Sequence, residues 1–178
     1  MNWHALFVEN GKEEIVQKYL QLYFDKSLLY SVVPKRKVPE KKGGRVSHVQ
    51  KKMFPGYVLI RTTMNTDIFY RIKEIPKCYS IVNNGLCYSK NKGTYYSTIT
   101  EEEINPILQL IGDGEIIDYS KVYLENSMVS VKSGPLVGME GIIKKVDKHK
   151  NRAKILLKFF GVERTIDVGI EIISNSNK

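Results

Sequence analysis

The sequence has little cysteine and histidine, and it has no long apolar run. Its 178 residues include two cysteines, Cys78 and Cys87, and three widely separated histidines, His4, His48 and His149. Two cysteines without metal-ligand spacing favour free thiols in a reducing compartment. No apolar stretch approaches the roughly 20 residues of a membrane-spanning helix, and no cationic leader with an apolar core begins the chain. We therefore expect a soluble, cytoplasmic protein with no membrane partner.

The usual catalytic constellations are also missing. No histidine has paired carboxylates nearby, no glycine-rich loop precedes a Lys-Ser/Thr pair, and no Ser, His and Asp arrangement is evident. The acidic run Glu101–Glu103 follows Thr100, so it is better explained as a capping box, where the helix dipole favours negative charge. We predict that the protein is not an enzyme and needs neither a metal nor a cofactor.

Positive charge is in excess. Lys and Arg number 28 against 19 Asp and Glu, which gives a net charge of +9 and favours a polyanion or an acidic partner surface. Residues 35–52 are the most basic segment and contain one acid, Glu40. We predict a flexible hairpin tip between two strands, which is either a solvated loop or a salt-dependent, sequence-blind contact with nucleic acid. The cations assigned to that contact are Lys35, Arg36, Lys37, Lys41, Lys42 and Arg45.

The first 112 residues alternate between strand and helix patterns. Aromatic and β-branched clusters predict strands at 3–8, 30–33, 57–61 and 79–82. Apolar residues recurring every three or four positions predict helices at 12–24, 66–75 and 101–111. Asn65 is placed to cap the second helix, and Pro106 should kink or delay the third. This order indicates an α+β sandwich with helices packed on a small, mainly antiparallel sheet.

The pattern changes after residue 112. Residues 113–124 are acidic and are predicted to be a linker. Beyond them, short strands separated by glycine-containing turns are predicted at 128–131, 141–146, 152–160, 162–168 and 170–173. Such a series is typical of a small β-barrel. The predicted organisation is therefore a domain at 1–112, a linker at 113–124 and a second domain at 125–178.

The predicted strand at 152–160 has two unlike faces. One is purely apolar, and the other combines cations with Leu156 and Phe160. The second face is either solvated, with Phe160 under a loop, or an RNA contact, because bases stack on aromatic rings while cations meet phosphates. The candidate RNA-binding residues are Lys144, Lys145, Lys148, His149, Lys150, Arg152, Lys154 and Lys158.

The stretch 51–60 places two cations before Phe54, a Pro55-Gly56 bend, Tyr57 and an aliphatic strand. Proline fixes its own φ and glycine accepts angles that other residues avoid, so the pair predicts a turn. The turn would aim Phe54 and Tyr57 in directions set by the backbone. The local sequence leaves open whether the two rings belong to the core or to a contact surface.

Segments at both ends of the chain resemble a known family. Residues 131–142 resemble a KOW motif, with Gly141 at its fixed glycine, while 3–8 and 52–60 resemble the NusG N-terminal domain. Together they extend over nearly the whole chain, which therefore resembles the NusG family of transcription elongation and antitermination factors. The resemblance implies a NusG-type α/β sandwich followed by an SH3-like KOW barrel.

The resemblance also implies partners. In the NusG family the N-terminal domain docks on the clamp helices of RNA polymerase and suppresses pausing, and the matching docking residues here are Trp3, Phe54 and Tyr57. The KOW domain of the family meets Rho, a small-subunit ribosomal protein or RNA. Its apolar partner contacts correspond here to Leu136 and Phe160. We expect a monomer.

The basic segments depart from the housekeeping NusG pattern. They look more like the specialised LoaP subgroup, whose members are processive antiterminators recruited by a structured leader RNA. The leading hypothesis is an antiterminator that holds polymerase through its first domain and leader RNA through its second. Two alternatives stay open: a housekeeping NusG-like elongation factor whose KOW domain binds Rho or the ribosome, and a KOW-containing, ribosome-associated RNA-binding protein.

Overall fold

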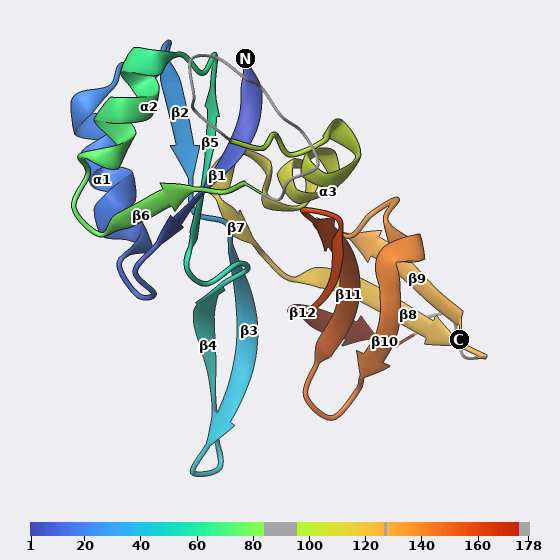
Figure 1. Cartoon of the computed structure of the whole chain (residues 1–178). Coiled ribbons are helices and arrows are strands. Elements are labelled where there is room, and N and C mark those ends of the chain that lie inside the picture. The colour runs from blue at the N-terminus through green and yellow to red at the C-terminus, as the bar shows by residue number, and fades with distance from the viewer. Residues whose placement is uncertain (84–95, 127, 175–178) are drawn as a thin grey trace. The chain divides into compact units, whose positions relative to one another are not determined.

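The computed structural model describes residues 1–83, 96–126 and 128–174 (Figure 1). Cys87 and most of the predicted turn at 83–85 lie outside these ranges. The chain divides into two compact units, Met1–Val33 with Phe54–Ile104 and Pro34–Met53 with Asn105–Lys178. Within the described ranges the chain is α+β, as predicted, with three α-helices among its strands. None of these helices is long and apolar enough to cross a membrane.

The first unit is built on an antiparallel sheet in the order β2-β5-β1-β6. Its strands are β1 (Asn2–Val8), β2 (Leu29–Val32), β5 (Tyr57–Thr62) and β6 (Cys78–Ile81). Helices α1 (Glu13–Tyr23) and α2 (Thr66–Lys73) lie on one side of it (Figure 1). The sequence predicts all six of these elements to within a few residues.

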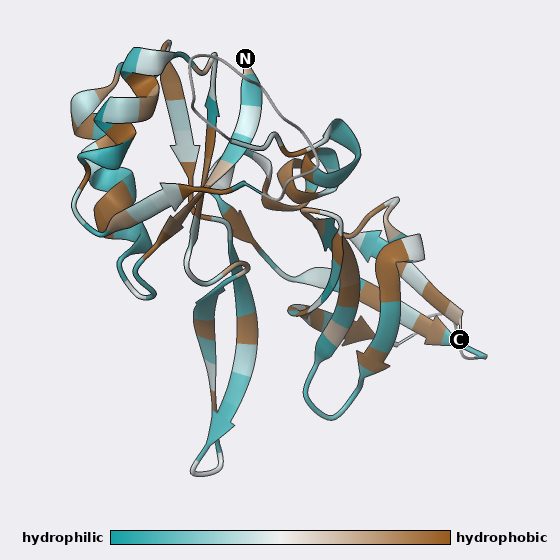
Figure 2. Cartoon of the chain, viewed as in Figure 1, coloured by the Kyte–Doolittle hydropathy of each residue, from teal (hydrophilic) through white to brown (hydrophobic). Residues whose placement is uncertain are grey.

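The side chains of this unit follow the periods expected of strands and helices. Figure 2 shows apolar and hydrophilic bands along both helices, as expected for helices with one face on a core. Asn65 caps α2 as predicted, because its Oδ1 accepts a hydrogen bond from the Ile68 backbone N–H at 2.8 Å. The buried cluster between helices and sheet includes Leu6, Val8, Val16, Leu20, Val58, Ile60, Ile68 and Ile72.

Residues 35–52 differ from the expected flexible tip. They form a complete hairpin of two strands, β3 (Lys35–Lys42) and β4 (Arg45–Lys52), paired from Lys35↔Lys52 to Lys42↔Arg45. Gly43 and Gly44 form the two-residue turn with φ of 57° and 79°, the positive values that a type I′ turn requires. β3 also pairs in parallel with β7 (Ile116–Ile117), so a distant segment stabilises a strand that carries little apolar pattern of its own.

The second unit contains a five-stranded sheet in the order β10-β11-β12-β8-β9. Its strands are β8 (Ser120–Glu125), β9 (Met128–Ser133), β10 (Ile143–Asp147), β11 (Arg152–Phe159) and β12 (Val162–Ile173). The predicted apolar face of β11 is confirmed, since Ala153, Ile155, Leu157 and Phe159 are buried. The short 3₁₀ turns η1 (Gly112–Gly114) and η2 (Glu140–Ile142) belong to the same unit.

Several predicted boundaries differ from the structure. Residues 113–124 contain part of η1, all of β7 and most of β8, rather than a plain linker. β8 pairs in parallel with β12, beginning at Ile170↔Ser120, a contact between segments 50 residues apart. The two predicted last strands form one strand, β12. The residue ranges of the compact units also differ from those of the predicted domains, because residues 34–53 belong to the second unit.

The third helix, α3 (Glu101–Ile111), begins where the acidic capping box predicts. The Glu103 backbone N–H donates to the Thr100 carbonyl at 3.1 Å, and Glu101, Glu102 and Glu103 occupy the first turn. Pro106 lies inside the helix. Its two expected effects were a kink and a delayed start of the helix, and the start is not delayed.

Candidate functional site

The Pro55-Gly56 bend is a tight turn, as predicted. The Tyr57 backbone N–H donates to the Phe54 carbonyl at 3.1 Å, and Gly56 has φ of 83°. Proline at the second position and a positive-φ glycine at the third define a type II turn. Two further contacts hold Gly56: its N–H donates to Glu13 Oε1 at 2.7 Å, and its carbonyl accepts from the Val8 N–H at 2.9 Å. The turn is therefore fixed to α1 and β1.

The turn separates the two rings that the sequence leaves ambiguous. Phe54 is only 3% exposed, so its ring belongs to the interior of the folded chain. Tyr57 is half-buried and its ring centroid lies 5.7 Å from that of Phe7. Of the pair, Tyr57 is the one that reaches the surface in this conformation.

Tyr57 belongs to a larger group of aromatic residues on the sheet of the first unit, which we call the aromatic face. Phe7 is 43% exposed and Tyr79 is 57% exposed, with ring centroids 5.6 Å apart. Trp3 is half-buried and meets the exposed Tyr30 edge to face at 6.0 Å. The aromatic face comprises Trp3, Phe7, Tyr30, Tyr57 and Tyr79. Sequence reasoning identified only Trp3 and Tyr57 among them.

Strand register explains why four of these rings share a face, whereas Tyr79 lies where the pairing of β6 with β1 is irregular. Phe7 pairs directly with Tyr57, while Trp3 and Tyr30 both pair with Arg61. Residues directly opposite one another in a sheet project to the same side. The alternate residues of β1, Leu6 and Val8, belong to the helix-packed core on the other side. Period-two alternation in β1 was the signal that could have identified Phe7.

The candidate RNA-binding residues come together around the β10–β11 hairpin of the second unit. Lys145 pairs with Lys154, and Asp147 pairs with Arg152. Six of the set are exposed lysines and a seventh, His149, is also exposed. Arg152 differs because its side chain is only 19% exposed, and Lys154 Nζ lies 3.3 Å from Asp167 Oδ1. The exposed set is Lys144, Lys145, Lys148, His149, Lys150, Lys154 and Lys158.

Comparison with known proteins identifies the family. The profile of the family described as "Transcription termination factor nusG" matches residues 1–108. The chain belongs to the NusG family. It is 26% identical over 172 residues to the transcription termination/antitermination protein NusG of Halalkalibacterium halodurans, covering 94% of each chain. It is 28% identical over 178 residues to the protein of the same name from Staphylococcus aureus, covering 96% of this chain and 93% of the other.

A solved structure resembles the whole NusG-family chain. That structure, described as "Domain interaction in Thermotoga maritima NusG", matches this chain with a TM-score of 0.57 and 25% sequence identity. The match covers 94% of this chain and 93% of the other. The structural likeness therefore extends beyond residues 1–108, which the family profile matches.

The two apolar residues predicted to contact a partner of the second domain lie in different environments. Leu136 is fully buried, and its N–H donates to Ser120 Oγ at 3.0 Å. Phe160 is half-buried beside Phe159 and has φ of 52°, so it lies in the β11–β12 turn rather than on the strand. In this conformation Phe160 is the more accessible of the two.

The predicted cations of residues 35–52 also separate into two groups. At the base of the β3–β4 hairpin, Arg36 donates to the Asp167 carbonyl, and Lys37 Nζ lies 3.2 Å from Asp118 Oδ1. Lys35 is half-buried there. At the tip, the side chains are exposed: Lys41, Lys42 and Arg45. The base of the hairpin is thus engaged within the second unit, and the tip presents its charge to solvent.

The first unit contains a buried histidine, from which we expect a pH-dependent stability. His4 is 1% exposed, its Nδ1 donates to the Ser97 carbonyl at 2.9 Å, and its Nε2 has no hydrogen-bond partner in the described structure. Burial lowers the pKa of His4 below its usual 6.5, although the bond to Ser97 opposes that shift. The unfolded chain therefore binds a proton more readily, and stability is lost as pH falls below 6.5.

We expect the unfolding free energy of the wild type to fall between about pH 7.5 and about pH 5.5, and to fall less in His4→Gln. The fluorescence of Trp3, the single tryptophan, reports urea unfolding of the first unit. His149→Gln is the control, because its side chain is exposed in the second unit. Equal slopes in the wild type and His4→Gln would contradict this prediction.

Proposed function

We propose that this NusG-family chain is a non-enzymatic transcription elongation factor that acts in the cytoplasm as a processive antiterminator of the LoaP type. Its first domain binds the clamp helices of RNA polymerase through the aromatic face. Its second domain, 125–178, is an SH3-like KOW barrel that binds a structured leader RNA. The chain acts as a monomer.

The observation that carries the polymerase contact is the aromatic face. Phe7, Tyr30 and Tyr79 are substantially exposed on one sheet surface around Tyr57. Exposed aromatic groups of this kind are unusual on a monomer and mark protein interaction sites. The rigid turn before β5, anchored by Glu13, keeps Tyr57 in place and reduces the entropy lost on binding.

The RNA contact is supported by the exposed lysines of the β10–β11 hairpin. Their side chains extend from two paired strands and one turn, so the positive charges lie close together. Phosphate contacts of this type supply affinity that weakens steeply with salt. One alternative is a housekeeping factor, which would use apolar contacts to bind Rho or a ribosomal protein. The other is a ribosome-associated protein, which would bind ribosomal RNA. Leu136 is fully buried, which favours the leader-RNA hypothesis over an apolar partner contact at Leu136.

The experiment is a read-through assay with purified RNA polymerase, a terminator template and the full chain. Tyr57→Ala is expected to weaken polymerase binding by about 2 kcal/mol or more, about 30-fold, because a central aromatic contact is lost. Read-through should fall in parallel while binding of the chain to leader RNA is unchanged. Tyr70→Ala is the matched control, since Tyr70 is an exposed tyrosine on α2, away from the aromatic face.

Unchanged read-through by Tyr57→Ala would contradict the polymerase contact. Wild-type chain that binds leader RNA no more tightly than a scrambled RNA would favour the housekeeping alternative. Co-purification of the chain with ribosomes instead of polymerase would favour the ribosome-associated alternative.

A further inference from the structure

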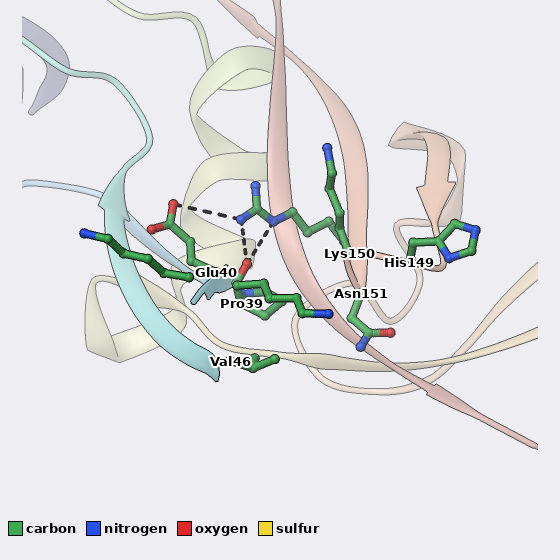
Figure 3. Close-up of a pocket in the computed structure, with 9 residues that line it drawn as sticks. Pro39, Glu40, Val46, His149, Lys150 and Asn151 are labelled. Atoms are coloured by element: carbon green, nitrogen blue, oxygen red, sulfur yellow. Dashed lines mark hydrogen bonds and ion pairs between the residues drawn. The ribbon is translucent and has the colours of Figure 1, made fainter. Parts of the chain in front are cut away.

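An open groove of about 530 Å³ separates the β3–β4 hairpin from the β10–β11 turn within the second unit. Residues 39–42 and Val46 form one wall, and residues 149–152 form the other. Figure 3 shows Pro39 and Glu40 on the hairpin side, with Lys150 and Asn151 on the side of the turn. Figure 3 also shows the His149 ring pointing away from the hairpin, which places it at the rim.

Arg152 holds the two walls together. Its Nη2 and Nε both donate to the Pro39 carbonyl, at 2.5 and 3.2 Å, across 113 positions of sequence. The same guanidinium lies 4.0 Å from Glu40 Oε1 and 3.9 Å from Asp167 Oδ2. A planar guanidinium can make such paired contacts, whereas a lysine ammonium cannot reproduce their geometry. Arg152 is therefore a structural link, rather than an exposed cation available to a ligand.

Contacts further along the hairpin support this link. His48 Nδ1 lies 2.6 Å from the Tyr119 hydroxyl, and the two rings meet edge to face. Lys37 pairs with Asp118 at the base. The hairpin is thus attached both to β11, through Arg152, and to the segment just before β8, so the groove has two fixed walls.

The charge in the groove is positive on both walls. Lys41 and Lys42 extend from the hairpin and Lys150 from the turn, and all three side chains are exposed. Lys42 attracts Glu40, and Lys150 attracts Asp147 beside the groove. The single carboxylate, Glu40, contacts Lys51 and lies near Arg152. This pairing lowers the pKa of Glu40, mainly through the Lys51 hydrogen bond, so the carboxylate stays ionised and partly neutralised.

The lining favours a polyanionic backbone over a compact ligand or a base-specific one. No Phe, Tyr or Trp residue is among the described residues that line this groove, and the His149 imidazole lies at its rim, so bases have little surface on which to stack inside it. Lysines act as point charges, which suits phosphates at variable positions along a strand.

We propose that the β3–β4 hairpin and the β10–β11 turn form one composite groove that binds the phosphate backbone of RNA, with Lys41, Lys42 and Lys150 as contacts and Arg152 as the positioning residue. The choice of RNA rests on the proposed function. The geometry adds that the hairpin and the turn act together as one site, although they are separated by about a hundred positions of sequence.

The test measures fluorescence anisotropy of a labelled leader RNA hairpin with the full chain over a range of salt concentrations. Replacing Lys41 and Lys42 by Gln should weaken binding and reduce the slope of log K against log salt by about one per lysine. Lys150→Gln should reduce it by about one more. The control replaces Lys18 and Lys26, exposed lysines of the first unit, and should leave both affinity and slope unchanged.

Arg152→Lys separates positioning from direct contact. It keeps the charge and removes the paired hydrogen bonds to Pro39. A direct phosphate contact would tolerate the change. A positioning role predicts that, in the Arg152→Lys background, replacing Lys41 and Lys42 by Gln costs little further affinity. In that background the hairpin is no longer held beside the β10–β11 turn.

Each outcome is informative. If the hairpin variant binds RNA like the control while Lys144→Gln/Lys145→Gln binds weakly, the composite groove is wrong and RNA binding by the second domain stands. If the wild type binds no RNA, the RNA part of the proposed function fails as well. A DNA duplex of the same sequence is the second probe: equal, groove-dependent binding supports backbone recognition, and preferential binding of DNA would overturn RNA as the ligand.

Discussion

Replacing Phe54 by alanine is expected to lower the free energy of unfolding by about 3 to 5 kcal/mol. The ring is 3% exposed, so its removal loses the transfer free energy of a buried aromatic ring. A further cost comes from the cavity that remains where the ring was. The type II turn that follows also depends on the position of Phe54, because its carbonyl accepts the turn hydrogen bond. Urea unfolding followed by Trp3 fluorescence measures the loss.

Phe7→Ala provides the matched comparison. Phe7 is 43% exposed, so its replacement should change stability by less than about 1 kcal/mol. A small effect at Phe54, comparable to that at Phe7, would show that the ring is not part of the core. The comparison also bears on function, since loss of activity in Phe54→Ala would reflect unfolding, whereas Tyr57→Ala tests the polymerase contact directly.

Replacing Gly169 by alanine is expected to destabilise the second unit by about 1 to 3 kcal/mol, and replacement by valine by more. A Cβ at this position would lie 2.8 Å from the Lys37 carbonyl and against the Tyr119 ring. β12 can therefore pass the hairpin only where it has no side chain. We expect either lower stability or release of the hairpin, because the carbonyl belongs to β3.

Amide hydrogen exchange distinguishes these two responses. Release of the hairpin would accelerate exchange in β3 and β7, whereas general destabilisation would accelerate exchange throughout the second unit. Gly141→Ala is the control, since a Cβ there would meet nothing within 4 Å and its φ is not in the positive region. Equal stability of the Gly169→Ala and Gly141→Ala variants would contradict the close approach seen in the structure.

The local elements of this protein were predictable because their signals are local. The helices follow from apolar spacing. The cap of α2 follows from Asn65, which accepts a hydrogen bond from the N–H of Ile68, three positions further along the chain. Pro55 and Gly56 set the backbone angles of the type II turn themselves. The alternating burial of β11 follows from its period of two.

Candidate residues were predicted less completely than the elements. Trp3 and Tyr57 were named from resemblance, but Phe7 and Tyr30 join them only through the register of β1, β2 and β5. Tyr79 joins them at the irregular pairing of β6 with β1, where the direct partner of Phe7 is Ser80. The lysines near 150 were evident from composition. Their relation to Lys41 and Lys42 depends on a contact that no local pattern encodes.

By itself, the sequence determined the helices, most of the strands, the turn chemistry and the excess of positive charge, because each depends on residues a few positions apart. Only the tertiary structure decided which ring of the Phe54 and Tyr57 pair faces solvent, and that residues 35–52 are strands. It also decided that Arg152 links two segments rather than offering its charge to a ligand. The first outcome depends on contacts of the turn with Glu13 and Val8. The other two depend on pairing of β3 with Ile116 and on contacts of Arg152 with Pro39 and Asp167, which lie far apart in sequence and close in space.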